Sequence, residues 1–415
     1  MFSDYTLWVY NFTLSMKIAV FTDTFYPMVN WVVTSTLTFI QKLAQRWHEI
    51  MVFCPYNKWV ENYKYQNIKI VYLRWVPALF YPEFKLTVFQ TTKVYRNFRK
   101  FNPDIIHFHT QFNIWLKGLI FWKTFGIPIV WTYHTKIADQ EYLKNLKLNN
   151  LKFVETLARS YNNFFYKYAD KVLTPSLESK KELIKHWIKK NEITVLENPL
   201  PIIEKPEIKK FFLKDLTSQA ILYVWRISKE KNLDITLNVF KKINEKKPDV
   251  KFVLVWDGPY FTWLQRTAKK LGISDSIILL GMIPHDDLIN SDIFSKTSMF
   301  LTCSTSETQW ITVLEANYFG LPVVWVNKWW LNELIKNNSN WYKASVESVD
   351  RLAFYCLKIL NDSELQKSLS QNAKDFTQKF DPEILTDKLE NIYFSLQKKK
   401  ELPSKKIPKL RLTSY

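Results

Sequence analysis

Glycine is the residue that this sequence most clearly lacks. It has 6 Gly in 415 residues, whereas the usual share of ~7% would give roughly 29. It also has 17 Trp, and many stand where turns or helix ends are expected, as in "QRWHEI", "YVWRIS", "LVWDGP", "KHWIKK" and "NKWWLNEL". Turns need glycine because it adopts positive φ at little cost. We therefore hypothesise that most of these tryptophans come from UGA codons that the source organism reads as glycine. The alternative is a protein that is rich in genuine tryptophan.

Cysteines and long apolar runs are also scarce. The three cysteines, Cys54, Cys303 and Cys356, have no metal or redox spacing, which argues against a disulfide framework and fits a reducing cytosol. No stretch approaches 18 apolar residues, so we expect no membrane-spanning helix. Residues 1–15 make a weak signal peptide, because they lack a basic start and a cleavage site. Since a strand-like "MKIAVFTD" begins at Met16, we expect them to be an upstream extension that is not translated in vivo.

The charge is strongly one-sided, with 58 Lys and Arg against 39 Asp and Glu and a net charge of +19. An excess of this kind favours acidic partners: nucleic acid, an anionic bilayer or phosphorylated small molecules. The composition of the genome is an equally good explanation. We expect no nucleic-acid partner, because the basic residues are not interleaved with aromatic ones and no reader motif appears.

Short Val- and Ile-rich runs alternate with helical segments along most of the chain, which is typical of parallel sheets covered on both faces. This pattern predicts an α/β protein with two doubly wound domains and a binding cleft between their strand ends. The Pro-containing segment "LENPLPIIEKPEIKKFF" predicts the connection between them. The expected organisation is residues 16–200, residues 201–380, a helix over 381–400 and a basic tail over 401–415.

The segment "STSETQWITVLEANYFGLPVVW" predicts a strand end, a loop, a helix and the next strand. Glu307 is expected in the loop, and Glu315 one turn into a helix that starts near Gln309. The amino end of such a helix suits a diphosphate, because its N–H groups are unpaired and it carries a partial positive charge. Trp310 would block that approach, whereas glycine would allow it. Taken alone, two glutamates at this spacing are most often solvated surface residues.

Two further segments carry candidate anion-binding residues. In "VWRISKEKNLD", Arg226 follows a strand and Lys231 lies near the start of the next helix, so both cations could neutralise a leaving diphosphate. Without context, a pair of exposed basic residues is the commoner explanation. In "FYPMVNWVVTS" a helix is expected from about Val32, and a glycine in place of Trp31 would create a second helix end open to an anion.

Histidines also fall at strand ends. His134 in "WTYHT" lies where a doubly wound domain keeps its working residues. For His107 and His109, in "IIHFHT", we expect one side chain to face the core and one the cleft. His48, His186 and His285 are interpreted as surface or turn residues. No His, Cys or Asp cluster has metal-ligand spacing, and no G-x-S-x-G, P-loop or G-x-G-x-x-G pattern appears.

Read with glycine for tryptophan, the motifs "NGVV", "RGHE", "VGRISKEKN", "VGDGP", "GMIP", "SETQGITVLEA" and "NKGGLNELI" follow one another from Met16 to about Lys398. This ordered set resembles the retaining glycosyltransferases of the GT4 family, which have the two-domain GT-B fold with a C-terminal helix that returns to the N-domain. "SETQG" and the pair "HFHTQF" and "YHT" look most like the diacylglycerol glycosyltransferase branch. The chain departs from the family at Trp31, Trp225, Trp310, Trp329 and Trp330, which as tryptophans would fill the donor site.

The resemblance implies a role for each matching residue. Arg226 and Lys231 would bind the nucleotide diphosphate, Glu315 the ribose hydroxyls and Glu307 the donor sugar. His134 would lie near the sugar 6-position and the reacting carbon. Main-chain groups would make the remaining donor contacts, at residue 31 with the diphosphate, at Gln309, Trp310, Ile311 and Thr312 with sugar and phosphate, and at Met282 and Ile283 with the base. The resemblance also implies retention at the anomeric carbon, a UDP- or GDP-sugar donor, no cofactor and no metal.

A basic segment, "FKLTVFQTTKVYRNFRKF", predicts a helix near Leu86–Phe101. Apolar residues on one side and cations around them suit either the surface of an anionic bilayer or packing on the N-domain sheet. The cations are Lys85, Lys93, Arg96, Arg99 and Lys100, and the apolar residues are Leu86, Phe89, Val94 and Phe101.

We therefore expect a cytoplasmic hexosyltransferase, peripheral at the inner face of the cell membrane, that moves a hexose from a nucleotide sugar to a diacylglycerol-type lipid. Within the same class, the acceptor could instead be a phosphoinositol lipid, a cell-wall or capsule precursor, or a soluble sugar. An inactive basic protein that binds lipid or nucleic acid is the alternative if the tryptophans are genuine.

Overall fold

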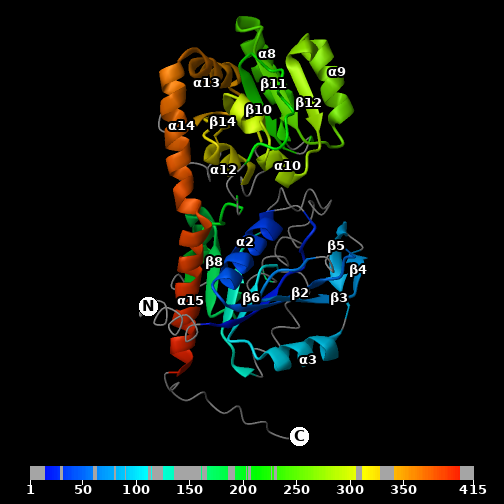
Figure 1. Ribbon diagram of the computed structural model, residues 1–415, viewed down its shortest axis with the longest axis vertical. Coiled ribbons are helices and arrows are strands. Elements are labelled where there is room, and N and C mark those ends of the chain that lie inside the picture. The colour runs from blue at the N-terminus through cyan, green and yellow to red at the C-terminus, as the bar shows by residue number, and fades with distance from the viewer. Residues whose placement is uncertain are drawn as a thin grey trace, which may run out of the picture. The chain divides into compact units, whose positions relative to one another are not determined.

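The computed structural model (Figure 1) divides the chain into two compact units. Unit 1 comprises Met1–Pro201 and Pro382–Tyr415, and unit 2 comprises Ile202–Asp381. The structure describes residues 15–28, 31–58, 63–78, 81–88, 90–110, 114, 125–134, 160, 166–185, 192–201, 203, 207–225, 227–228, 231–304, 311–327 and 341–401.

Unit 1 contains a seven-stranded sheet in the order β3-β2-β1-β6-β7-β8-β9, and every pair of neighbouring strands is parallel. Most of its strands are short and apolar, as expected for a sheet that is covered on both faces. The strands are β1 (Lys17–Phe21), β2 (Glu49–Pro55), β3 (Ile68–Leu73), β6 (Ile105–Phe108), β7 (Ile129–Thr132), β8 (Lys171–Thr174) and β9 (Ile193–Val195). The described helices are α2 (Trp31–Gln45), α3 (Thr91–Phe101), α7 (Leu177–Lys185) and α15 (Pro382–Glu401).

Alternate strand residues of unit 1 build two separate cores, one on each face of the sheet. On one face, Ala19 and Phe21 pack with Val94 and Phe98 of α3. The opposite face, with Ile18 as one of its residues, packs against α2 and α15. This is the period-two alternation of a parallel strand, written into "KIAVF".

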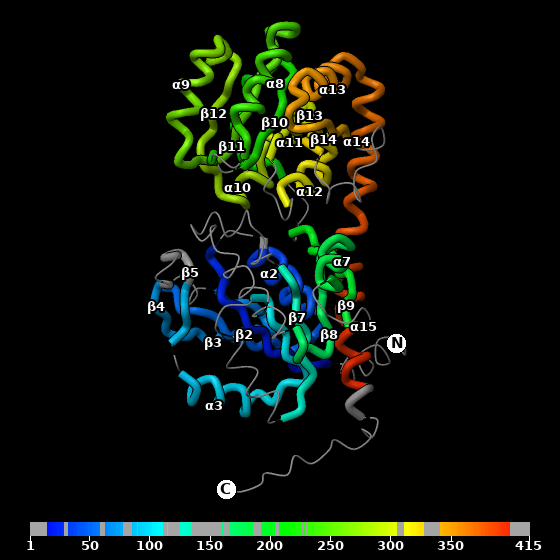
Figure 2. The backbone as a smooth tube through the Cα atoms, turned by 180° about the vertical axis from the view of Figure 1, so that it is seen from behind, coloured from blue at the N-terminus to red at the C-terminus, as the bar shows by residue number. Residues whose placement is uncertain are grey.

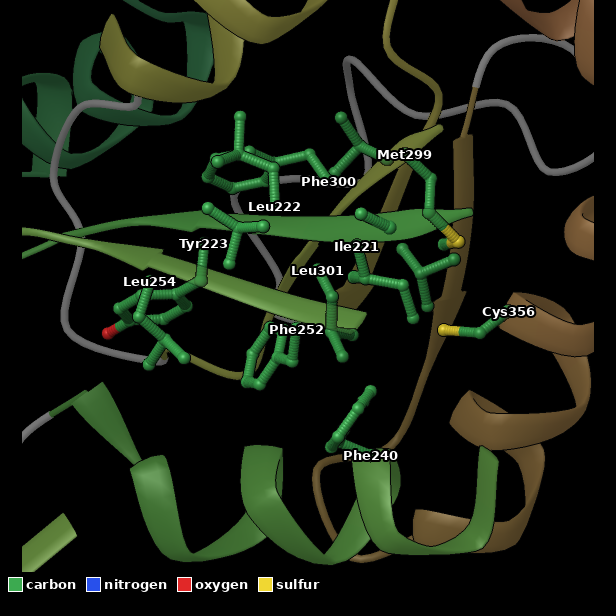
Figure 3. Packing of buried hydrophobic residues seen from close by; sticks show 14 of the residues in the cluster. Ile221, Leu222, Tyr223, Phe240, Phe252, Leu254, Met299, Phe300, Leu301 and Cys356 are labelled. Atoms are coloured by element: carbon green, nitrogen blue, oxygen red, sulfur yellow. The ribbon is translucent and has the colours of Figure 1, made fainter. Parts of the chain in front are cut away.

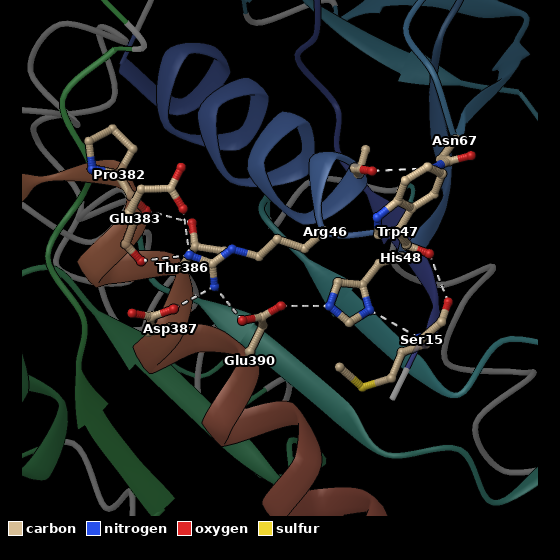
Figure 4. Close-up of polar contacts among 12 residues, drawn as sticks. Ser15, Arg46, Trp47, His48, Asn67, Pro382, Glu383, Thr386, Asp387 and Glu390 are labelled. Atoms are coloured by element: carbon tan, nitrogen blue, oxygen red, sulfur yellow. Dashed lines mark hydrogen bonds and ion pairs between the residues drawn. The ribbon is translucent and has the colours of Figure 1, made fainter. Parts of the chain in front are cut away.

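An ion-pair clamp holds α15 against the carboxyl end of α2 (Figure 4). Arg46 follows α2 and contacts Glu383 at 2.5 Å, Asp387 at 2.6 Å, and Glu390. Burial works against the charge of Arg46, but hydrogen bonds to Glu383 and Asp387 and the charge of Glu390 outweigh it and raise its pKa. His48, which is buried, hydrogen-bonds Glu390 at 2.7 Å and accepts from the Met16 N–H at 3.0 Å.

The predicted helix near Leu86–Phe101 begins later than expected. Residues 81–87 form β5 (Tyr81–Thr87), which pairs antiparallel with β4 (Trp75–Ala78), and Leu86 lies opposite Val76. The helix α3 starts only at Thr91 (Figure 2). The prediction was wrong because hairpin pairing satisfies the backbone of a segment whose Tyr, Phe and Thr side chains also suit a strand.

Unit 2 contains a six-stranded sheet in the order β12-β11-β10-β13-β14-β15, again with parallel neighbours. The strands are β10 (Ala220–Val224), β11 (Lys251–Val255), β12 (Ile277–Gly281), β13 (Met299–Thr302), β14 (Val323–Val326) and β15 (Trp341–Ala344). The helices are α8 (Leu233–Lys246), α9 (Phe261–Leu271), α10 (His285–Ile289), α11 (Ile293–Lys296), α12 (Ile311–Tyr318), α13 (Val349–Asn361) and α14 (Ser363–Thr377), with 3-10 turns η4 (Ser274–Ser276) and η6 (Gln378–Phe380).

The core of unit 2 is continuous and almost wholly apolar. Phe240 of α8 stacks on Phe252 of β11 with ring centroids 4.9 Å apart, and Cys356 of α13 lies in the same core (Figure 3). Both units therefore have the predicted architecture of a doubly wound parallel sheet with helices on both faces. No helix in the described part of the chain is long and apolar enough to span a membrane.

Candidate functional site

In both units the strand order reverses beside the first strand of the sheet. In unit 1 the chain leaves β1 toward β2 and later returns to β6, and in unit 2 it leaves β10 toward β11 and returns to β13. Open parallel sheets bind ligands at the carboxyl ends of the strands at such reversals. The candidate sites are therefore built from the residues that follow β10, β12 and β13 in unit 2 and β1, β6 and β7 in unit 1.

Glu315 lies on α12, one turn after its first residue Ile311, as the sequence predicted. Its side chain is 2% exposed, and Oε1 lies 2.7 Å from Nε2 of His285, the first residue of α10. Desolvation lowers the pKa of His285, but the hydrogen bond and charge of Glu315 outweigh it, so the pKa is raised overall. The interpretation of His285 as a plain surface or turn residue missed this contact.

The donor residues of α12 and the β12 end are placed as follows. Ile311 and Thr312 are the first two residues of α12, and the buried Thr312 hydroxyl has no hydrogen-bond partner within the described part of the chain. Met282 and Ile283 follow β12; Met282 is 69% exposed, and Ile283 is buried in the core. In the segment from Met282 to His285, the side chain of Ile283 is therefore fixed in the core, whereas that of Met282 points to solvent.

Lys231 lies two residues before the first residue of α8. Its Nζ lies 5.5 Å from the ring centroid of Trp225, which directly follows β10. Asn232, which precedes α8, donates from Nδ2 to the carbonyl of Cys303 at 3.0 Å and so joins the helix start to the end of β13. The predicted diphosphate-binding lysine thus lies at the strand ends, with its ammonium over an indole.

Ile227, which follows Arg226 in the sequence, packs closely against the residues that follow β11. The Ile227 N–H bonds the Asp257 carbonyl at 3.1 Å, and a Cβ added to Gly258 would lie 2.2 Å from the Ile227 oxygen. Only glycine fits at 258 for this reason. Two residues earlier, Trp256 has a φ of 119°, a backbone conformation that strongly favours glycine.

Unit 1 places an aspartate at its strand ends that sequence reasoning missed. Asp23 is 3% exposed; its Oδ2 accepts from the Thr110 hydroxyl at 2.7 Å, and its N–H donates to the same hydroxyl oxygen at 2.6 Å. The pair joins the residues after β1 to those after β6. An acidic residue two positions past the first strand of a doubly wound domain was the signal that could have identified it.

Three buried histidines continue this cluster. His109 Nδ1 lies 3.1 Å from His134 Nε2, with the rings stacked at 5.4 Å. His107 bonds the Tyr393 hydroxyl of α15 at 2.6 Å and the Thr132 hydroxyl at 2.7 Å. His134 thus lies at a strand end as predicted. The expectation that His107 and His109 face opposite ways was wrong, because residues two apart on a strand share a face, and their ring centroids are 4.0 Å apart.

Burial keeps these histidines neutral. Desolvation lowers the pKa of His109 to about 3. Desolvation, with a smaller contribution from His109, lowers the pKa of His134 well below its ordinary value, and the pKa of His107 is lowered for the same reason, with His109 and His134 adding to it. A neutral imidazole at a strand end is suited to hydrogen bonding rather than to charge pairing.

The apolar side of α3 packs on the unit 1 sheet. Val94, Phe98 and Phe101 are buried in the core. Arg96, Arg99 and Lys100 are exposed. Lys93 is exposed too and donates to the Tyr72 carbonyl at 2.8 Å, and Lys85, on β5, lies 4.9 Å from the Trp75 ring centroid. The outward face of α3 is therefore basic, without the apolar face that insertion into a bilayer requires.

Several predicted site residues lie outside the described part of the chain. They are Arg226, Glu307, Gln309 and Trp310, together with His186, Phe89, Trp329 and Trp330. Trp31 is the first residue of α2, one position before the expected helix start at Val32, and its side chain is outside the described set.

Comparison with known sequence families divides the chain at nearly the same point as the fold does. Residues 32–202 match the family described as Glycosyltransferase Family 4, and residues 204–376 match the family described as Glycosyl transferases group 1.

Individual relatives agree with this assignment. The chain is 31% identical to the alpha-monoglucosyldiacylglycerol synthase of Streptococcus pneumoniae over 78% of this chain and 74% of that protein. It is 25% identical to the enzyme of the same name from Acholeplasma laidlawii over 92% of this chain and 97% of that protein. The crystal structure of Anabaena HepE in complex with UDP-glucose has the same fold, with a TM-score of 0.70 at 18% identity over 92% of this chain and 100% of that chain.

Proposed function

Because this chain belongs to the family 4 glycosyltransferases, with the GT-B fold and a nucleotide-sugar donor, we propose that it transfers a hexose to a diacylglycerol-type lipid. The observation that carries the proposal is the 31% identity to an alpha-monoglucosyldiacylglycerol synthase across most of both chains. UDP-glucose is the first donor to test, since HepE was solved with it.

The donor half of the proposal uses groups gathered at the strand ends of unit 2. A sugar nucleotide already carries a good leaving group, so the enzyme mainly has to stabilise charge on the departing diphosphate. Lys231, Arg226 and the amino end of α12 are proposed to do this without a metal, and Glu315 to bond the ribose. Glu307 and His134 are proposed to contact the transferred hexose, which is expected to keep its anomeric configuration.

Tryptophan at the donor residues conflicts with this role, and we propose that the functional protein carries glycine there. Among the described residues other than glycine, only Trp47, Trp256 and three asparagines have positive φ. Asparagine tolerates this region, whereas a bulky aromatic residue does not. Glycine at 225 would also remove the indole under Lys231. The gene is expected to have UGA at positions 31, 47, 225, 256 and 310; UGG there would refute the substitution.

Membrane contact is proposed to be electrostatic. Arg96 and Arg99 are exposed on α3 beside Tyr95, whose ring lies 6.4 Å from that of the exposed Phe125. Such cations contribute about 1 kcal/mol each on an anionic surface. The double variant Arg96→Ala/Arg99→Ala should therefore bind vesicles that contain anionic lipid about 30-fold more weakly. A matched control, Arg266→Ala/Lys270→Ala on the exposed face of α9, should not change binding.

The decisive experiment measures nucleotide release from a panel of UDP- and GDP-sugars by the glycine-containing protein, with and without diacylglycerol in anionic vesicles. We expect release that depends on diacylglycerol and is unaffected by EDTA, and a glucosylated lipid as the product. Lys231→Ala should lower kcat/KM by about 100-fold, roughly the loss of one charge-stabilising contact. Release that depends only on a soluble sugar, or full turnover in Glu307→Gln, would refute the proposed acceptor or the proposed site, respectively.

A further inference from the structure

We infer that His285 is a positioning residue for donor binding: it holds the buried carboxylate of Glu315 in place and couples it to the segment after β12. This inference rests on the proposed function, in which Glu315 bonds the ribose. The observation behind it is the 2.7 Å contact between His285 Nε2 and Glu315 Oε1, which joins α10 to α12.

A buried carboxylate needs a donor that fixes it. The Glu315 side chain is 2% exposed, and an ionised group at such depth is stable only when it is paired and hydrogen-bonded. His285 supplies a donor, and its side chain is 37% exposed, so the contact lies at the edge of the unit 2 core rather than deep inside it. A carboxylate accepts several hydrogen bonds at once, so the contact to His285 leaves lone pairs for ribose hydroxyls.

The chain around His285 explains why it can act as a rigid support. Ile283, two residues earlier, is buried in the unit 2 core, and Pro284 forms the N-cap of α10. Leu288 and Ile289 bury the other side of the same short helix. The imidazole is therefore attached to a segment that is anchored at both ends, so the position of Glu315 depends on the position of Met282 and Ile283, the residues expected at the nucleotide base.

The charged residue next to His285, Asp286, provides a control for the His285 variants. Asp286 has its Oδ1 3.9 Å from His285 Nδ1, and its side chain is fully exposed. It faces Nδ1 of the imidazole, whereas Glu315 contacts the other ring nitrogen, Nε2. Replacing it changes the local charge but leaves the bond between His285 and Glu315 intact.

The test compares UDP binding and donor kinetics in one background, the glycine-containing protein. His285→Ala should weaken UDP binding and raise the donor KM by about 10-fold, with kcat changed less than 3-fold. His285→Gln should recover most of the affinity, because its Nε2 amide can donate to Glu315 from a similar position. Asp286→Asn should bind UDP as the parent does.

A double-mutant cycle separates positioning from a general structural effect. If His285 acts through Glu315, then His285→Ala in a Glu315→Gln background should cost less than 2-fold further affinity. Independent, multiplicative losses would overturn the inference, as would unchanged UDP binding in His285→Ala. If the parent protein binds no UDP- or GDP-linked compound, the proposed function itself fails. If the parent binds UDP and His285→Ala binds it equally well, only the positioning role is refuted.

Discussion

Units 1 and 2 share one strand pattern but place their histidines in opposite environments. Unit 1 buries its three histidines, His107, His109 and His134, and desolvation lowers the pKa of each. In unit 2, His285 contacts a buried glutamate, which outweighs desolvation and raises its pKa. The same fold can therefore hold neutral hydrogen-bonding histidines at one set of strand ends and, at the other, a histidine whose protonated form is favoured by a neighbouring glutamate.

The largest expected effect is a difference in acid sensitivity between the units. The three unit 1 histidines have folded pKa values below 6.5, so the unfolded chain binds more protons, and stability is lost as the pH falls below about 6.5 toward the folded values. Well below pH 6.5, each contributes a slope of about 1.4 kcal/mol per pH unit, so the three together give about 4 kcal/mol per pH unit. His285 has the opposite sign: its contribution is present below about pH 6.5 and is lost as the pH rises through its raised pKa.

Hydrogen exchange measured peptide by peptide at pH 7.5, 6.5 and 5.5 would test this difference. Protection of the β6 and β7 peptides in unit 1 should fall well before that of β10 and β11 in unit 2. Equal loss in both units, or earlier loss in unit 2, would contradict the comparison.

A smaller effect is expected from the clamp on α15. Arg46→Ala removes the shared partner of Glu383, Asp387 and Glu390, and Glu390 lies half-buried at its contact with His48. Breaking a partly buried pair from one side should lower the free energy of unfolding of unit 1 by about 2–3 kcal/mol. Urea denaturation would measure it. Lys367→Ala, which breaks the exposed pair with Glu364 in unit 2, should change stability by less than about 0.5 kcal/mol.

The smallest effect concerns one turn in each unit. Trp47→Gly in unit 1 and Trp256→Gly in unit 2 relieve φ values of 68° and 119° and should each stabilise the protein by about 1 kcal/mol. Asn102→Gly, at a φ of 49°, should change stability by only a few tenths of a kcal/mol, because asparagine tolerates that region. Thermal unfolding of the single variants gives the comparison. Destabilisation by both glycines would show that the indoles make contacts worth more than the strain.

Much of the fold was predictable because it is written in local patterns. The alternation of apolar runs and helices predicted two doubly wound units, and the position of Glu315 one turn into α12 is confirmed. The start of α3 was not predictable from the segment itself, since residues 81–87 pair with a neighbouring strand instead of extending the helix. The shared face of His107 and His109 was available from strand periodicity and was misjudged.

The candidate site was predictable only in part. Motif order pointed to Lys231 and Glu315, and the comparisons with family 4 glycosyltransferases support the same family. Asp23 and His285 were missed because the partner of each is distant in sequence. Asp23 contacts Thr110, which is 87 positions away, and His285 contacts Glu315, which is 30 positions away.

By itself the sequence determined the class of fold, the strand ends on which chemistry would sit, and the shortage of glycine, because each depends on residue types at short spacing. The tertiary structure alone decided which buried groups meet. It paired His109 with His134, set His285 against Glu315 and drew three carboxylates of α15 onto Arg46. The physical reason is that hydrogen bonds and charge pairs act over a few ångströms in space, whereas the residues that make them are separated by tens to hundreds of positions along the chain.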